Sequence, residues 1–131
     1  MATVPLLADA EAGAEALATF NDIRAKRKTD YVNNFWRALA HDPALLRATW
    51  ERVQTVMGPG ALDPLVKELI YVAVSTANGC DYCVHSHTAA ARAKGMTPAQ
   101  HGELLAVIAM ASQTNALATA LSVPVDDRFK A

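Results

Sequence analysis

The feature that most constrains the fold is a long apolar segment, residues 65–76, between two chain breaks. An Asp-Pro pair at 63–64 suits a helix start, and an Asn-Gly pair at 78–79 suits the left-handed turn that ends a helix. Lys67 and Glu68 are the only charges between them. The β-branched content makes a strand the alternative. The unbroken length of the run and the lack of alternating partner segments favour a buried helix.

The remaining segments also carry helical patterns. The sequence predicts helices that begin near Asp9, Asp30, Asp42-Pro43, Asp63-Pro64, Cys80-Asp81 and Thr97-Pro98, with a last helix over 115–121. Polar residues at 112–115 interrupt the uncharged run 104–125, which we interpret as two buried helical pieces and a connection. We therefore predict an all-α, compact single-domain helical bundle over 1–131, of about six to seven helices. Residues 1–8 would be a loose lead-in and 123–131 a tail.

Composition and charge exclude some classes of partner. A formal net charge of −1 gives no reason to expect a nucleic-acid or anionic-membrane partner. The first residues lack the basic and apolar regions of a signal peptide, and the interrupted uncharged run does not suit a membrane span. We expect a cytoplasmic protein with no nucleic-acid and no membrane partner. In a reducing compartment a C-x-x-C pair is more often redox-active or metal-binding than structural.

Both cysteines of the chain, Cys80 and Cys83, follow the apolar helix with C-x-x-C spacing. Such a pair closes a small disulfide ring on oxidation, and so short a loop makes a poor structural staple. At a helix N-terminus the positive end of the dipole favours a thiolate. Cys83 and His87 are four residues apart, so they share a helix face where the imidazole can accept the thiol proton. The pattern predicts a reactive dithiol.

Glu68 is a second candidate because it lies within the apolar body of the preceding helix. Burying an unpaired carboxylate is costly, so this residue needs a partner. If the two helices fold back antiparallel, Glu68 could orient His87 or pass a proton toward Cys83. A structural salt bridge with Lys67 or an arginine is the alternative.

Tyr82 and His85 are further pocket or relay candidates. Tyr82 lies between the cysteines, and His85 points to another side of the helix from the Cys83–His87 face. A zinc site using Cys80, Cys83 and both histidines is a rival interpretation. Structural zinc sites normally take ligand pairs from separated segments, and His85 and His87 diverge on a helix. We expect no metal and no organic cofactor.

The spacing E-x11-C-x-x-C-x3-H, formed by Glu68, Cys80, Cys83 and His87, resembles the signature of the alkylhydroperoxidase AhpD-like branch of the carboxymuconolactone decarboxylase family. The resemblance extends upstream through residues 34–43 and downstream to about residue 121. It implies an all-α homo-oligomer, usually a trimer or hexamer.

The resemblance also implies chemistry. Cys83 would attack a hydroperoxide, Cys80 would resolve the product, and Glu68 with His87 would form a proton relay. Tyr82 stands where the best-studied members carry a histidine. The expected reductant is a dithiol, and the resemblance suggests a lipoylated protein. Two alternatives stay open: a carboxymuconolactone-type decarboxylase, whose members lack this cysteine pair, and a non-enzymatic redox-sensing or metal-binding module.

Overall fold

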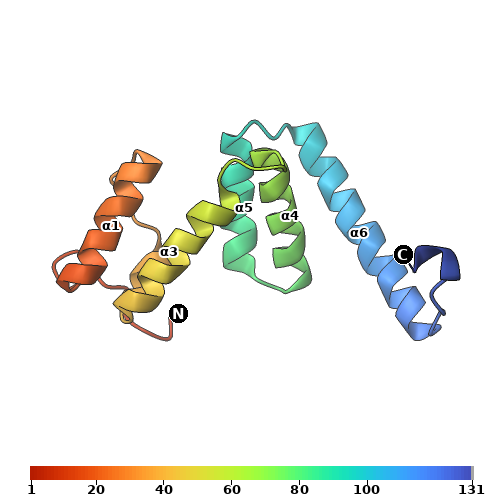
Figure 1. Cartoon of the computed structure of the whole chain (residues 1–131), viewed down its shortest axis with the longest axis horizontal. Coiled ribbons are helices and arrows are strands. Elements are labelled where there is room, and N and C mark those ends of the chain that lie inside the picture. Colours follow the sequence, from red (N-terminus) through yellow and green to blue (C-terminus); the bar gives the residue numbers. More distant parts are fainter. Residues whose placement is uncertain (131) are drawn as a thin grey trace. The chain divides into compact units, whose positions relative to one another are not determined.

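The computed structural model describes residues 1–130, which are helical without any strand. The elements are α1 Ala14–Arg27, α2 Asn34–Leu39, α3 Pro43–Met57, α4 Pro64–Ala77, α5 Asp81–Ala93, α6 Pro98–Ala120 and a 3-10 helix, Asp127–Phe129 (Figure 1). The all-α prediction is confirmed. The chain divides into two compact units, an N-terminal unit Met1–Gly58 and a C-terminal unit from Pro59 onward. The single-domain expectation stays a prediction.

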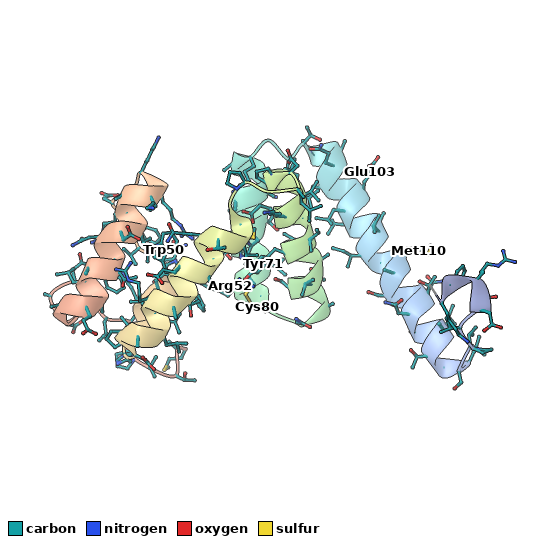
Figure 2. The ribbon with its side chains drawn as sticks, viewed as in Figure 1. Trp50, Arg52, Tyr71, Cys80, Glu103 and Met110 are labelled. Carbon is teal, nitrogen blue, oxygen red and sulfur yellow. A yellow bond between two sulfur atoms is a disulfide. The ribbon has the colours of Figure 1, made fainter. Side chains whose placement is uncertain are left out.

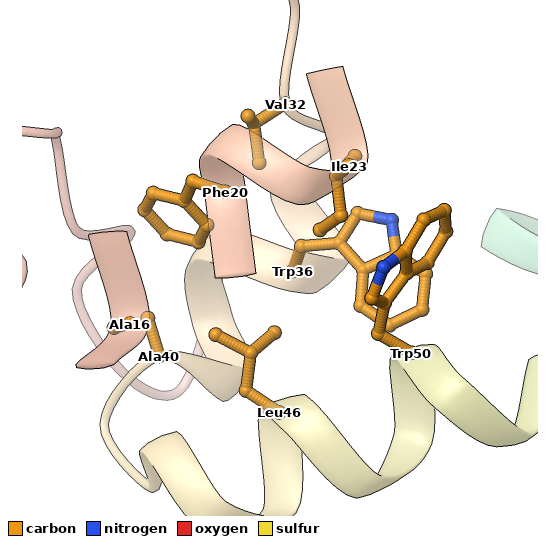
Figure 3. Packing of buried hydrophobic residues seen from close by; sticks show 8 residues of the cluster. All are labelled: Ala16, Phe20, Ile23, Val32, Trp36, Ala40, Leu46 and Trp50. Carbon is orange, nitrogen blue, oxygen red and sulfur yellow. The ribbon is translucent and has the colours of Figure 1, made fainter. Parts of the chain in front are cut away.

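The N-terminal unit has an apolar core drawn from α1, α2, α3 and the connection before α2. The buried side chains are Ala16, Phe20, Ile23, Val32, Trp36, Ala40, Leu46 and Trp50 (Figure 3). Trp36 and Trp50 meet edge to face with ring centroids 5.5 Å apart, a favoured aromatic geometry. The indole N–H of Trp50 donates to Asp22 Oδ2 at 2.7 Å, so the buried ring keeps a polar partner.

The beginning of the chain is attached to this unit by polar contacts. Asp9 forms salt bridges with Arg24 at 2.7 Å and with Arg37 at 3.2 Å, and Arg37 Nη1 donates to the Leu7 carbonyl at 2.7 Å. The prediction that Asp9 starts the first helix is wrong, because its carboxylate binds these guanidinium groups. Helix α1 begins at Ala14, after Gly13.

The start of the second helix was also predicted too early. Helix α2 begins at Asn34 with Asn33 in the capping position. The carbonyl of Asp30 instead accepts a hydrogen bond from Arg24 Nε at 2.9 Å. That residue therefore belongs to the connection between α1 and α2.

Three other helix starts were predicted correctly, because local side chains determine them. Asp42 Oδ1 accepts from the Leu45 N–H at 3.0 Å, and Asp63 Oδ1 accepts from the Leu65 N–H at 2.8 Å. At α6, Thr97 forms a reciprocal capping box with Gln100. Each of these helices has proline in its first turn. Backbone N–H groups of the first turn have no partner within the helix, so proline costs no hydrogen bond there.

In the C-terminal unit, α4 and α5 lie side by side (Figure 1) and pack extensively. The chain reverses through a short connection in which Gly79 has φ +68°, a left-handed conformation that glycine adopts without steric cost. The Cys80 N–H then donates to the Ser75 carbonyl at 2.9 Å. This antiparallel hairpin buries Glu68, Val72 and Ser75 of α4, and Ala91 of α5.

The break that the sequence predicted near residue 112 is absent from helix α6. The helix runs without interruption from Pro98 to Ala120 and has no buried residue, so the prediction of two buried pieces is wrong. The Thr114 hydroxyl bonds the Met110 and Ala111 carbonyls at 3.1 and 3.2 Å, and the polar run is accommodated within the helix. Across residues 1–130, no helix is long and apolar enough to cross a membrane.

Candidate active site

The cysteine pair lies at the beginning of α5, as predicted. Cys80 is the N-cap residue and forms a disulfide with Cys83, with Cα atoms 5.4 Å apart. The Cys80 sulfur also accepts a hydrogen bond from the Cys83 N–H at 3.3 Å. Both cysteines therefore lie where the unpaired N–H groups of the helix favour negative charge on sulfur. Figure 2 labels Cys80 at the start of α5, and Tyr71 on the neighbouring α4.

Glu68 and His87 meet across the hairpin. His87 Nδ1 lies 2.7 Å from Glu68 Oε2, and Glu68 is only 4% exposed. The fold-back of α4 on α5 thus makes the contact that sequence reasoning considered. Because His87 is one turn beyond Cys83 on α5, its imidazole lies on the helix face that carries Cys83.

A lysine completes the surroundings of Glu68. Lys94 Nζ lies 2.9 Å from Glu68 Oε1, so each carboxylate oxygen has a partner of its own. Burial raises the pKa of Glu68, but hydrogen bonds and positive charge from His87 and Lys94 outweigh it, and the net pKa lies below the ordinary glutamate value. Glu68 is therefore ionised at neutral pH.

The partner of Glu68 in this salt bridge is one that sequence reasoning missed. It considered Lys67 or an arginine, whereas Lys94 is 26 residues away along the chain. A signal was present, because His87 and Lys94 are seven residues apart and therefore lie on one side of the same helix.

The structure places Tyr71 against the imidazole of His87. The Tyr71 ring stacks on this imidazole, with centroids 3.5 Å apart and planes at 17°. Glu68 and Tyr71 are three residues apart on α4, so both face α5. The imidazole is held at its edge by the carboxylate and at its face by the phenol ring.

The two lesser candidates, Tyr82 and His85, are exposed. Tyr82 is 44% exposed, and His85 is exposed on α5, away from the side that carries Cys83 and His87. Within residues 1–130, no three His, Cys, Asp or Glu side chains gather in a way that could hold a metal ion. The zinc interpretation therefore lacks a ligand set in that part of the chain.

The contacts define which nitrogen of His87 carries the proton. An ionised carboxylate only accepts hydrogen bonds, so His87 must donate from Nδ1 to Glu68. In the neutral imidazole, Nε2 is then left as the basic nitrogen. This tautomer suits a base that removes a thiol proton, and it follows from the hydrogen-bond partners.

Comparison with known proteins identifies the family. The family model described as "Carboxymuconolactone decarboxylase family" matches residues 43–126. The chain belongs to this family. Its match covers α4, α5 and the whole candidate site, so the family assignment rests on the part of the chain that carries the cysteines.

Individual relatives indicate the AhpD-like branch. The crystal structure of the alkylhydroperoxidase AhpD core from Rhodospirillum rubrum is 66% identical, with a TM-score of 0.96 over 100% of this chain and 98% of that chain. The alkyl hydroperoxide reductase AhpD of Solibacter usitatus is 40% identical over 75 residues, 57% of this chain and 40% of that protein. An uncharacterised protein from Cupriavidus necator is 35% identical over 83 residues, 63% of this chain and 74% of that protein. The match thus spans less than half of the Solibacter protein.

Proposed function

We propose that this protein is a thiol-dependent peroxidase that reduces organic hydroperoxides through Cys80 and Cys83. The observation that carries the proposal is the hydrogen bond of 2.7 Å between His87 and buried Glu68. His87 lies one helical turn beyond Cys83 on α5. It supplies a base with a defined tautomer beside a cysteine pair at a helix N-terminus. The names of the R. rubrum and S. usitatus relatives support the same activity.

The first half-reaction uses Cys83 as the nucleophile. His87 Nε2 accepts the thiol proton, and the thiolate sulfur attacks one peroxide oxygen. The O–O bond breaks as an S–O bond forms, and the leaving alkoxide takes the proton from His87 to become the alcohol. Cys83 is oxidised to a sulfenic acid while the peroxide is reduced. Glu68 stabilises the imidazolium during the transfer.

The second half-reaction returns the enzyme to its dithiol form. Cys80 attacks the sulfenic sulfur, the S–S bond forms, and hydroxide leaves and is protonated to water. An external dithiol then reduces the disulfide and is itself oxidised to a disulfide. The reductant we expect is a lipoylated protein, and a cytoplasmic location suits a cycle that depends on reduced dithiols.

A homo-oligomer, a trimer or hexamer, is part of this proposal. Its support is the set of large apolar side chains that α6 leaves exposed. These are Leu105, Val107, Met110 and Leu117. Exposed apolar side chains gathered on one helix are typical of an interface. Sedimentation equilibrium on the wild type and on Val107→Glu tests it, and we expect the variant to dissociate.

Thiol titration after one equivalent of cumene hydroperoxide tests the peroxidase. Fully reduced wild type should lose both thiols and release one equivalent of alcohol. Cys80→Ser should hold a trappable sulfenic acid at Cys83. Cys83→Ser should lose alcohol formation by on the order of 10³-fold or more.

Two results would count against the proposal. A sulfenic acid found only in Cys83→Ser would reverse the roles of the cysteines. Unchanged wild-type thiols would refute the peroxidase, and lactone decarboxylation by a variant lacking both cysteines would then favour the reaction that gave the family its name.

A further inference from the structure

We propose that Lys94 is a positioning residue that fixes the direction of proton transfer, because its ammonium keeps Glu68 as an acceptor for the Nδ1–H of His87. This inference rests on the peroxidase proposal for its kinetic meaning. Its structural part, the tautomer of one histidine, can be tested without peroxide.

The geometry of Glu68 carries the argument. Oε2 accepts a hydrogen bond from His87 Nδ1 at 2.7 Å, and Oε1 accepts one from Lys94 Nζ at 2.9 Å. The Glu68 side chain is 5% exposed while that of Lys94 is 39% exposed. A carboxylate with almost no contact with water is thus joined to a lysine whose side chain stays partly exposed. The lysine can lower the cost of burying the negative charge, and its own desolvation is smaller than that of Glu68.

Lys94 is held in place by the end of α5. It is the C-cap residue, and its N–H donates to carbonyls of the last turn, including that of Ala90 at 3.1 Å. Gly95 follows with φ +95° and turns the chain away. The lysine stem therefore starts from a fixed backbone, and a cation near the C-terminus of a helix is also favoured by the dipole.

Loss of the ammonium would change the proton on the neighbouring imidazole. Without it, burial would act on Glu68 with less opposition, and the carboxyl group would protonate at higher pH. A protonated carboxyl can donate to Nδ1, which moves the histidine proton to Nε2. The nitrogen that should accept the Cys83 proton would then already carry one. Lys94 prevents this reversal.

Other titratable groups lie on the helices of the hairpin and on α6, which packs against α4. They are Lys67 and Tyr71 on α4, Asp81, Tyr82, His85 and Arg92 on α5, and His101 and Glu103 on α6. The hydrogen bonds described for the Glu68 carboxylate go to His87 and Lys94. Removal of the lysine charge should therefore act on Glu68 more strongly than removal of any other charge in this group.

The experiment compares the wild type with Lys94→Met, Lys94→Arg and the control Lys26→Met, which removes an exposed lysine from α1. Nitrogen-15 shifts of His87 report the tautomer in the full-length protein. We expect Nδ1–H in the wild type, the control and Lys94→Arg, and a shift toward Nε2–H in Lys94→Met. The rate of thiol loss with cumene hydroperoxide should fall about tenfold at pH 7 in Lys94→Met. In the plot of this rate against pH, the acidic limb of Lys94→Met should lie at higher pH than that of the wild type.

The outcomes separate the two proposals. An unchanged tautomer and an unchanged pH profile in Lys94→Met would overturn the role of Lys94, even if the rate fell. A shifted tautomer in a protein whose wild type does not react with peroxide would support the positioning role and refute the peroxidase. Failure of Lys94→Arg to restore both the tautomer and the pH profile would count against a role of the positive charge.

Discussion

The N-terminal and C-terminal units bury different kinds of side chain. The N-terminal unit buries a cluster of eight apolar side chains, including two tryptophans (Figure 3). The buried positions of the C-terminal unit are Val72, Ala91 and Met96, together with polar Glu68 and Ser75. One unit thus concentrates packing, and the other concentrates polar chemistry. Stability and reactivity should therefore respond to substitutions in different parts of the chain.

The largest effect should come from Phe20→Ala, in the N-terminal core. Phe20 is fully buried, so its truncation leaves a cavity and should lower the free energy of unfolding by about 3–5 kcal/mol. Phe35→Ala is the matched control, because Phe35 is 43% exposed and should cost about 1 kcal/mol. Urea unfolding measures both. Equal losses would show that burial in the N-terminal cluster does not determine the cost of removing a phenylalanine ring.

The next effect should come from Glu68→Gln, measured by unfolding as a function of pH. The pKa of Glu68 is lowered from 4.5 in the folded protein. The folded state therefore binds fewer protons than the unfolded state as pH falls through and below that value. The stabilisation is complete above pH 4.5 and is lost as pH falls through the folded pKa.

Glu68→Gln should be less stable at neutral pH by on the order of 1–3 kcal/mol, because hydrogen bonds to a charged group are lost. It should also lose part of the acid dependence below pH 4.5. If the acid transition of Glu68→Gln were identical to that of the wild type, another group would cause the loss of stability at acid pH, and Asp9 would be the next candidate. Burial raises the pKa of Asp9, but Arg24 and Arg37 lower it by more, so its net pKa lies below the ordinary aspartate value.

A smaller effect is expected for Tyr71→Ala, which removes the ring stacked on His87. The imidazole would lose one of its two restraints, and the rate of peroxide-dependent thiol loss should fall about tenfold. Tyr71→Phe keeps the ring and should retain most of the rate. If the phenylalanine variant falls as far as the alanine variant, the hydroxyl and not the stacking is what the reaction needs.

The smallest effect is expected for His85→Gln. His85 is exposed on α5, away from the side that carries Cys83 and His87, so both stability and thiol oxidation should stay within about twofold of the wild type. A large loss in stopped-flow thiol oxidation would bring His85 back as a member of the relay. It would also show that the chemistry extends beyond the inner face of the hairpin.

Helix starts were predictable where a side chain next to the start determines it. Asp42, Asp63 and Thr97 each cap the helix that follows within a few residues, so local sequence was sufficient. Asp9 was a wrong prediction because its carboxylate is taken by Arg24 and Arg37, the latter 28 residues away along the chain. Contacts of that range cannot be deduced from spacing.

The same distinction applies to the candidate site. The helix face shared by Cys83 and His87 follows from a spacing of four residues, and the contact with Glu68 follows if the helices fold back. The contact with Lys94 requires knowing how far α5 runs past Glu68, and the stacking of Tyr71 requires the rotation of α4 about its axis. Periodicity gave the face of each helix, but the pairing of the faces depends on the tertiary packing.

The hairpin of α4 and α5 has one more consequence, for inheritance. All six side chains of the site, from Glu68 and Tyr71 through Cys80, Cys83 and His87 to Lys94, lie within one uninterrupted segment. One duplication or recombination event in the gene can therefore move all six residues together. A site assembled from distant segments would need several coordinated exchanges. The hairpin from Asp63 to Gly95, which includes the capping residue of α4 and the turn after α5, is thus the segment to transplant when the proposed dithiol chemistry is tested in another helical scaffold.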